Sequence, residues 1–159
     1  RLKYVFPDDE KSMLSLAVQE DCTGVGESLI QAGLDVNHQD KFEWTPLIMA
    51  SSAGRLEMVE MLLRNGADPK LCDRSDQSSI SVAARNGRLS IIKKLVEHGG
   101  VIDCDDIGYA GVGGDTDTIK YFIEQKAKKN PGILKHGIDS AVQTVLNEGA
   151  MYRWAAYDD

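Results

Sequence analysis

The 159-residue sequence is poor in cysteine, proline and aromatic residues, and it lacks an excess of positive charge. Its three cysteines, Cys22, Cys72 and Cys104, form no CxxC pair, which argues against a disulfide scaffold and favours a reducing compartment. The formal charge of −7 does not provide the basic surface that nucleic-acid binding needs. Apolar runs are too short for a transmembrane helix. We therefore expect an intracellular, cytoplasmic protein that binds neither nucleic acid nor membrane, with a secreted effector as the alternative.

The sequence repeats itself at a step of 33 residues. Apolar and glycine positions of segment 45–70 recur one step later, in the pairs Leu47/Ile80, Ala50/Ala83, Gly54/Gly87, Leu56/Leu89, Val59/Ile92, Leu62/Leu95, Leu63/Val96 and Gly66/Gly99. One step earlier, the equivalent positions hold Leu14, Ala17, Leu29, Ile30 and Gly33. This many matches at a single step predict an internal structural repeat.

Each repeat has the pattern of a helical hairpin. Thr45 is a candidate N-cap, followed by Pro46 at the first helical position, and Ser12 and Ser78 are equivalent to Thr45. Gly54 predicts a turn, and the apolar residues at 56, 59, 62 and 63 share one face of a second helix. A hairpin this short cannot bury its apolar face alone, so we expect the units to stack as a solenoid.

These features resemble the ankyrin-repeat family. The unit from Asp40 to Cys72 has TPL at 45–47, VEMLL at 59–63 and GAD at 66–68. Ile48 stands where the family has a histidine that links adjacent loops, and Ser15 and Ser81 stand in the equivalent places. The resemblance implies an all-α solenoid of helix-turn-helix units with short β-turn fingers, and a function in protein–protein interaction.

We expect one ankyrin-repeat domain that fills the chain. Its predicted units are 8–39, 40–72, 73–104, 105–130 and 131–150, with a C-terminal cap at 151–159. The fourth unit is irregular, because Gly87 recurs as Gly114 after only 27 residues. We place the six missing residues at Asp103–Gly108, in a shortened finger. Residues 137–150 match the second helix of a fifth unit, and Met151 and Trp154 are candidates for the cap.

Motifs for catalysis or for cofactor binding are weak. The glycines of 108–114 have the spacing of a phosphate-binding loop, but no Lys follows them and Asp115 would repel phosphate. We interpret this run as a repeat loop and a helix-to-helix turn. The acidic segment Asp103–Asp106 lacks the EF-hand pattern, and we interpret it as solvated carboxylates. The histidines have no metal-ligand spacing. We therefore predict no catalytic residue, no cofactor and no metal, and no enzymatic activity.

Binding is the function that remains, and the resemblance implies a concave face made of finger tips and first-helix ends. The partner-binding residues that it implies are Lys41, Phe42, Trp44, Ser52, Arg74, Ser75, Gln77, Arg85 and Asn86, together with Lys11, Gln19 and Glu20 in the first unit. Phe42 and Trp44 stand out, because aromatic side chains are frequent hot spots at interfaces. The alternative for Trp44 is that it packs down on its own loop or covers the adjacent unit.

The expected function is that of an adaptor or scaffold, monomeric by itself, that binds a partner protein or peptide on the concave face. An acidic inhibitor or immunity protein that blocks a partner enzyme is one alternative. The recognition domain of a larger effector or enzyme is another. Residues 1–40, 41–100 and 101–159 carry net charges of −5, +2 and −4, so charge alone leaves both acidic and basic partners open.

Overall fold

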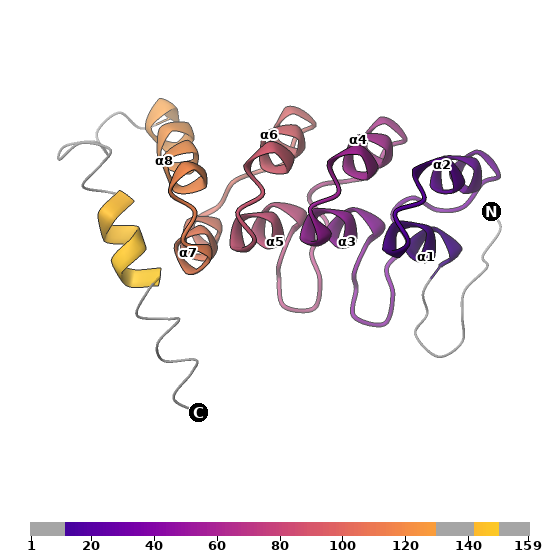
Figure 1. The fold of residues 1–159 in the computed structure, drawn as a ribbon, viewed down its shortest axis with the longest axis horizontal. Coiled ribbons are helices and arrows are strands. Elements are labelled where there is room, and N and C mark those ends of the chain that lie inside the picture. Colours follow the sequence, from indigo (N-terminus) through magenta and orange to yellow (C-terminus); the bar gives the residue numbers. More distant parts are fainter. Residues whose placement is uncertain (1–11, 130–141, 150–159) are drawn as a thin grey trace.

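The computed structural model describes residues 12–129 and 142–149 of the chain. Its helices are α1 (Met13–Gln19), α2 (Thr23–Gln31), α3 (Pro46–Ala53), α4 (Leu56–Arg64), α5 (Ser79–Arg85), α6 (Leu89–Glu97), α7 (Cys104–Gly113) and α8 (Thr116–Lys129), and residues 142–149 are also helical. Consecutive helices form antiparallel pairs that stack side by side, with α1, α3, α5 and α7 in one row and α2, α4, α6 and α8 in the other (Figure 1). This arrangement confirms the predicted all-α repeat solenoid.

Hydroxyl side chains begin α1, α3 and α5 of the first row, as the sequence predicts. The Thr45 hydroxyl accepts a hydrogen bond from the backbone N–H of Ile48 at 3.1 Å. Ser12 and Ser78 accept equivalent bonds at the starts of α1 and α5. These bonds satisfy backbone N–H groups that have no partner within the helix. Gly54 ends α3 in the left-handed conformation, with a φ of 77°, which glycine adopts without strain.

Ser79 occupies in α5 the position that Pro46 occupies in α3, and its buried hydroxyl has no hydrogen-bond partner in the structure. The preceding Ser78 is extended, with φ −80° and ψ 172°, as a residue before proline should be. We expect Ser79→Pro to raise the free energy of unfolding by about 0.5–1 kcal/mol, because proline restricts the unfolded chain. Urea unfolding measures this gain. Ser81→Pro is the control and should destabilise, since the N–H and hydroxyl of Ser81 are both bonded.

The hydrophobic core lies between the two rows and continues through every helix pair. Its largest fully buried side chains include Leu14, Leu47, Met58, Met61, Leu62, Ile80, Ile92, Leu95, Ile119 and Phe122. Each unit therefore buries its apolar face against its neighbours, as a solenoid requires. The core extends into the fourth unit, where Ile119 and Phe122 of α8 have no exposed surface.

The shortened connection before the fourth unit is confirmed, but its predicted position is wrong. The linker before α5 spans residues 65–78, whereas the linker before α7 spans only 98–103. Residues 104–108, which we expected in a loop, form the start of α7 instead. Helix α7 has 10 residues and α5 has 7, so a longer helix recovers part of the deletion. The fourth unit has consequently lost its finger and kept both of its helices.

The glycines of 108–113 lie in α7 rather than in a loop, while Gly114 forms the predicted turn with a φ of 74°. Gly113 lies against the end of α5, where a Cβ atom would come within 2.5 Å of the Arg85 carbonyl oxygen. Gly111 lies against helix 142–149, where a Cβ atom would come within 2.7 Å of the Val145 carbonyl oxygen. The run therefore allows close approach of helix backbones.

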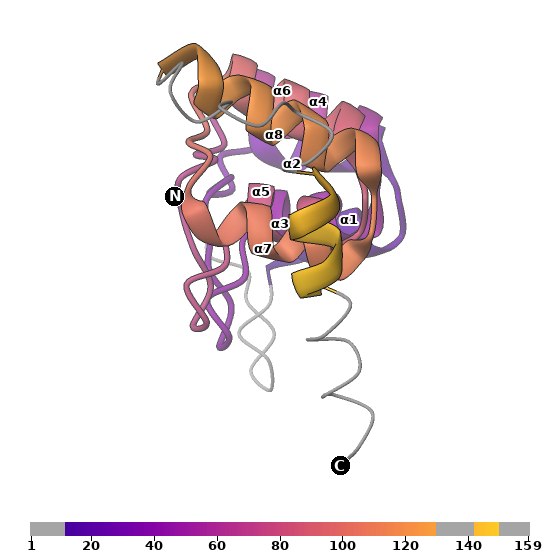
Figure 2. The ribbon, with the colours of Figure 1, turned by 90° about the vertical axis from the view of Figure 1, so that its left-hand side faces the viewer.

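Helix 142–149 crosses α7 instead of extending the two rows (Figures 1 and 2). Val142 is buried, and Val145 and Leu146 pack against the core. Gly149 approaches Gly111 so closely that a Cβ atom on Gly149 would overlap the backbone of α7. The remainder of the predicted fifth unit lies outside the described residues, as does the predicted cap at 151–159 with Met151 and Trp154, so the unit boundaries stay a prediction there.

The interpretation of Asp103–Asp106 as solvated carboxylates is wrong for Asp106, which has no exposed surface. Asp103 caps α7 by accepting a hydrogen bond from the Asp106 N–H at 2.9 Å. The Asp106 carboxylate accepts the Asp103 N–H at 2.9 Å and the Ser81 hydroxyl at 2.7 Å. Ser81 and Asp106 both stand three residues after their caps, where the family has histidine. This bond therefore joins the third and fourth units at the histidine position.

Burial raises the pKa of Asp106 above the ordinary value for a carboxyl, and the hydrogen bonds offset only part of that effect. The contribution of Asp106 to stability is therefore present at acidic pH and is lost as pH rises through its folded-state pKa. We expect Asp106→Asn to become more stable relative to the wild type as pH increases from 4 to 7. Urea unfolding at several pH values tests this trend. The exposed Asp105 supplies the control Asp105→Asn, for which no such trend is expected.

Candidate partner-binding groove

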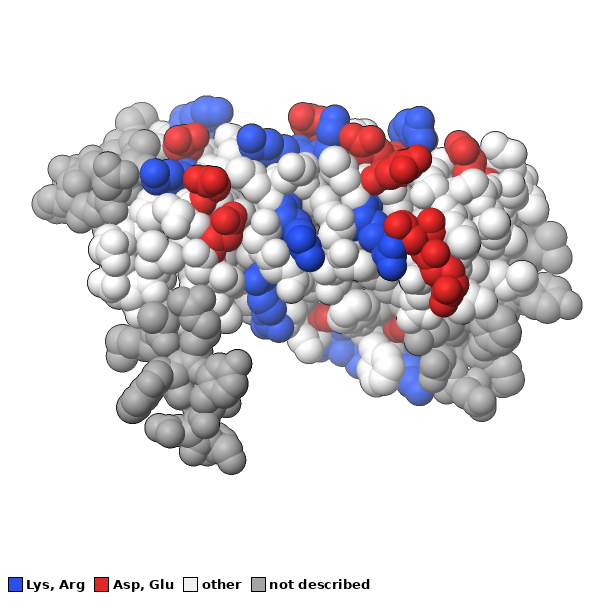
Figure 3. Space-filling model, viewed as in Figure 1, with Lys and Arg blue, Asp and Glu red and all other residues white. Residues whose placement is uncertain are grey.

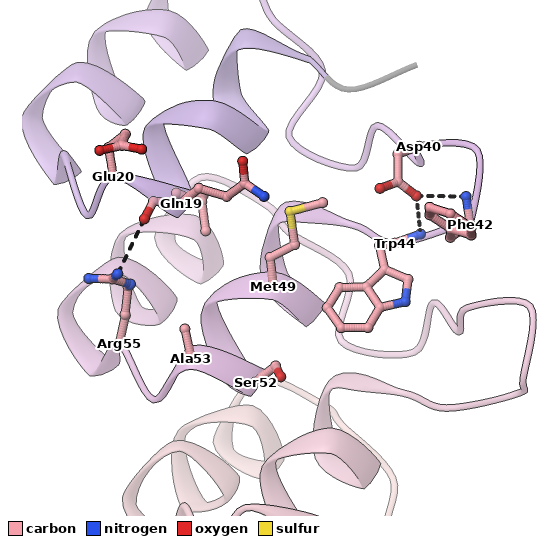
Figure 4. A pocket seen from close by; sticks show the side chains of 10 residues that line it. Gln19, Glu20, Asp40, Phe42, Trp44, Met49, Ser52, Ala53 and Arg55 are labelled. Carbon is pink, nitrogen blue, oxygen red and sulfur yellow. Dashed lines mark hydrogen bonds between the residues drawn. The ribbon is translucent and has the colours of Figure 1, made fainter. Parts of the chain in front are cut away.

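An open groove of about 610 Å³ separates the first and second units. We call it the Trp44 groove, and it is lined by Val18, Gln19, Glu20, Asp40, Phe42, Trp44, Met49, Ser52, Ala53 and Arg55. Its walls come from the end of α1, from the loop before α3 and from α3 itself (Figure 4). The groove brings together three predicted contact residues of the second unit, Phe42, Trp44 and Ser52. It also includes Gln19 and Glu20 of the first unit.

A buried aspartate shapes the finger that carries both aromatic residues. One carboxylate oxygen of Asp40 accepts the N–H groups of Phe42 at 2.9 Å and Trp44 at 3.0 Å. The Asp40 N–H donates in turn to the Trp44 carbonyl at 3.1 Å, and Glu43 takes a φ of 63° within the turn. The same pattern recurs in the next finger, where Asp73 takes the place of Asp40. These bonds hold the aromatic residues in a defined loop.

The two fingers are bonded to each other, although Ile48 replaces the family histidine. The Arg74 N–H donates to the Phe42 carbonyl at 3.2 Å. The Gln39 side-chain amide donates to the Glu43 carbonyl at 2.9 Å and to the Cys72 carbonyl at 3.0 Å. The wall of the groove is therefore supported by the neighbouring unit.

Trp44 both packs on the core and lines the groove, so the two interpretations of this residue are compatible. Its ring is half-buried and lies beside Met49 and Ser52 (Figure 4). The indole N–H has no hydrogen-bond partner within the described residues. Phe42 is 53% exposed at the finger tip, where the Lys41 ammonium lies 5.2 Å from the centre of its ring. The groove thus presents one anchored and one exposed aromatic side chain.

The other predicted contact residues lie outside the Trp44 groove. Arg74 and Ser75 are exposed on the second finger and Gln77 is half-buried, and Arg74 lies 3.8 Å from Glu43. The Arg85 guanidinium lies 4.9 Å above the Tyr109 ring. The Asn86 side chain donates to the Val82 carbonyl at 2.8 Å. Lys11 lies outside the described residues.

Arg55 was not among the predicted contact residues, and it closes one end of the groove. Its guanidinium lies 2.6 Å from the Asp21 carboxylate and donates to the Gln19 carbonyl at 3.2 Å (Figure 4). Arg55 follows the Gly54 turn, and Asp21 lies in the equivalent turn of the first unit. Since stacked units place equivalent turns side by side, the repeat register contained the signal for this ion pair.

The described residues show no geometry that points to metal chemistry or to a reactive thiol. Among them, no group of three or more His, Cys, Asp or Glu side chains is placed to hold a metal ion. Burial, together with the nearby Asp76 carboxylate, raises the pKa of the Cys72 thiol, which favours the protonated form. None of the described helices combines the length and the apolar character needed to cross a membrane.

The fold and the groove define a solenoid of the kind that serves as a binding module. A family model for ankyrin repeats, in three copies, matches residues 14–106. The match covers more than half of the chain, and the chain belongs to the ankyrin-repeat family. Repeats of this family generally mediate protein–protein interaction and are typically binding modules rather than enzymes. No curated protein matches the chain in sequence.

Proposed function

We propose that the protein is an interaction module that holds a segment of a partner protein in the Trp44 groove. The observation that carries this proposal is the position of Trp44, a large aromatic side chain supported by the core and open to the groove. Aromatic anchors of this kind supply a large share of binding energy at interfaces. The sparse cysteines, with Cys22 exposed as a free thiol, favour a site of action in the reducing cytoplasm.

The groove suits a partner segment because its surface is mixed. The two aromatic residues and the exposed Ala53 offer apolar contact, with the buried Val18 and Met49 behind them, while Gln19 and Ser52 offer polar groups. Ligand sites commonly combine apolar walls with a few polar groups that fix orientation. The bonds of the two fingers arrange this surface before binding, which reduces the entropy lost when a partner docks.

We extend the proposed surface along the third unit to Arg74, Ser75, Gln77, Arg85 and Asn86, with Lys41 at the finger tip. These residues occupy repeat-equivalent positions or neighbouring ones, and most of them are exposed. The hydrogen bond from the Arg74 N–H to the Phe42 carbonyl joins the two finger tips, so that they present one continuous surface. A folded partner would contact this second area, whereas a short peptide would need only the Trp44 groove.

The experiment is capture of partners from a source-cell lysate by immobilised wild type, Trp44→Ala and Val101→Ala. Val101 is 60% exposed and lies away from the groove, so its variant controls for loss of apolar surface. We expect proteins that bind the wild type and Val101→Ala but bind Trp44→Ala at least about tenfold more weakly. Equal capture by all three proteins would contradict the proposed site. Arg85→Glu then tests whether the third unit contributes.

A further inference from the structure

We propose that the segment bound in the Trp44 groove carries an arginine whose guanidinium stacks on Trp44, while Glu20, at the other end of the groove, favours its positive charge (Figure 4). This inference rests on the proposed function and adds the chemistry of the partner. It follows from the ring and from the charges that line the groove.

Cations already cover several of the aromatic rings of the molecule. Lys41 lies over Phe42 at 5.2 Å, Arg85 over Tyr109 at 4.9 Å and Lys93 over Tyr121 at 5.7 Å. No cation of the described residues lies over Trp44 in this way. Tryptophan is the best ring for a cation–π contact. Trp44 therefore offers an unoccupied platform for a cation that a ligand brings.

The charges around the groove also favour a cation. Arg55 is the groove's basic side chain, and it is already bonded to Asp21 and to the Gln19 carbonyl. Glu20, in contrast, has no ion-pair partner among the residues that the structure describes. Acidic side chains gather over the α1–α2 end of the stack, beside basic ones nearer its centre (Figure 3). An acidic ligand would meet Glu20, and the basic side chain that lines the groove, Arg55, is already paired.

Arginine suits this site better than lysine. Its planar guanidinium can stack on an indole ring while its N–H groups donate at the ring edge. Ser52 and Gln19 lie near Trp44 in the groove, and neither side chain has a hydrogen-bond partner within the described part of the chain (Figure 4). Both carry an oxygen that accepts hydrogen bonds. A lysine ammonium would keep the charge and lose the stacking plane.

The test uses a display library of random peptides selected on the wild type and counter-selected on Trp44→Ala. The selected peptides are then synthesised, each with its arginine kept or replaced by lysine or alanine. We expect an arginine in the Trp44-dependent peptides, and several-fold weaker binding when lysine replaces it. Glu20→Gln should weaken binding by no more than about twofold, and less at high salt, because its carboxylate acts from the other end of the groove. Glu57→Gln is the matched control, because Glu57 is exposed on α4 and does not line the groove, so the same change there should have no effect.

The outcomes separate this inference from the proposed function. Trp44-dependent peptides that lack arginine, or that bind equally well when lysine replaces their arginine, would overturn the inference of an arginine and leave the groove as the binding site. Peptides that bind the wild type and Trp44→Ala equally would contradict both proposals, as would a selection that yields no Trp44-dependent peptide.

Discussion

Replacing Phe122 by alanine is expected to lower the free energy of unfolding by about 3–5 kcal/mol. Phe122 lies in α8 with no exposed surface, and it is among the largest side chains of the core. Removing its ring leaves a cavity between the two rows that the surrounding helices fill only in part. Because units of a solenoid contact only their neighbours, we expect the loss to appear first in residues 104–129. Urea unfolding measures the loss, and hydrogen exchange locates it.

Phe42→Ala is the matched control for this prediction, since the same ring is removed from a finger tip where it is 53% exposed. Its effect on unfolding should stay below about 1 kcal/mol. Equal effects of the two substitutions would show that the irregular fourth unit does not belong to the cooperative core. Full retention of exchange protection in α7 and α8 of Phe122→Ala would contradict the account in the same way.

Gly113→Ala is expected to destabilise the protein by about 1–3 kcal/mol. A Cβ atom at Gly113 would lie 2.5 Å from the Arg85 carbonyl oxygen and 3.0 Å from that of Ala84. Both atoms belong to the backbone of α5, so α7 would have to move away from α5 to relieve the overlap. Thermal or urea unfolding gives the magnitude of the effect.

Gly24→Ala provides the opposite case. Gly24 also lies in a helix, α2, but a Cβ atom there would meet nothing within 4 Å. Alanine should therefore stabilise this position by about 0.5–1 kcal/mol through its better helix propensity. Gly113→Ala and Gly24→Ala should therefore change the free energy of unfolding in opposite directions. A gain in stability from both would mean that α5 and α7 do not approach each other as closely as the structure shows.

Much of the fold was predictable because the first three units repeat at one step. Hydroxyl caps, glycine turns and apolar spacing are local signals, and they located α3 and α5 without any tertiary information. The helices of the fourth unit were harder to predict, because a glycine at a close helix crossing cannot be told from a glycine in a loop by sequence alone. The burial of Asp106 was also not predictable, since its partner Ser81 belongs to the preceding unit.

Prediction of the candidate site was limited in the same way, by contacts between units that the sequence does not show. Repeat position singled out Phe42, Trp44 and Ser52 as contact residues, and the structure places these three around one groove. The interaction partner of each charged side chain was difficult to predict, because it depends on contacts between units. The repeat register places Asp21 and Arg55 in adjacent turns, but the stacked structure is needed to show that they pair and that Arg85 lies over Tyr109. The proposed preference for a cationic ligand rests on the pairing of Arg55 with Asp21 and on the absence of a cation over Trp44 among the described residues.

The most direct test of the Trp44 groove is the fluorescence of Trp44 itself. The chain has two tryptophans, so Trp154→Phe leaves Trp44 as the single reporter. We expect its emission to change in a saturable way when a captured partner or selected peptide is added, with the same Kd that anisotropy of the labelled ligand gives. Unchanged emission at a ligand concentration that saturates the anisotropy signal would place binding elsewhere and contradict the central claim.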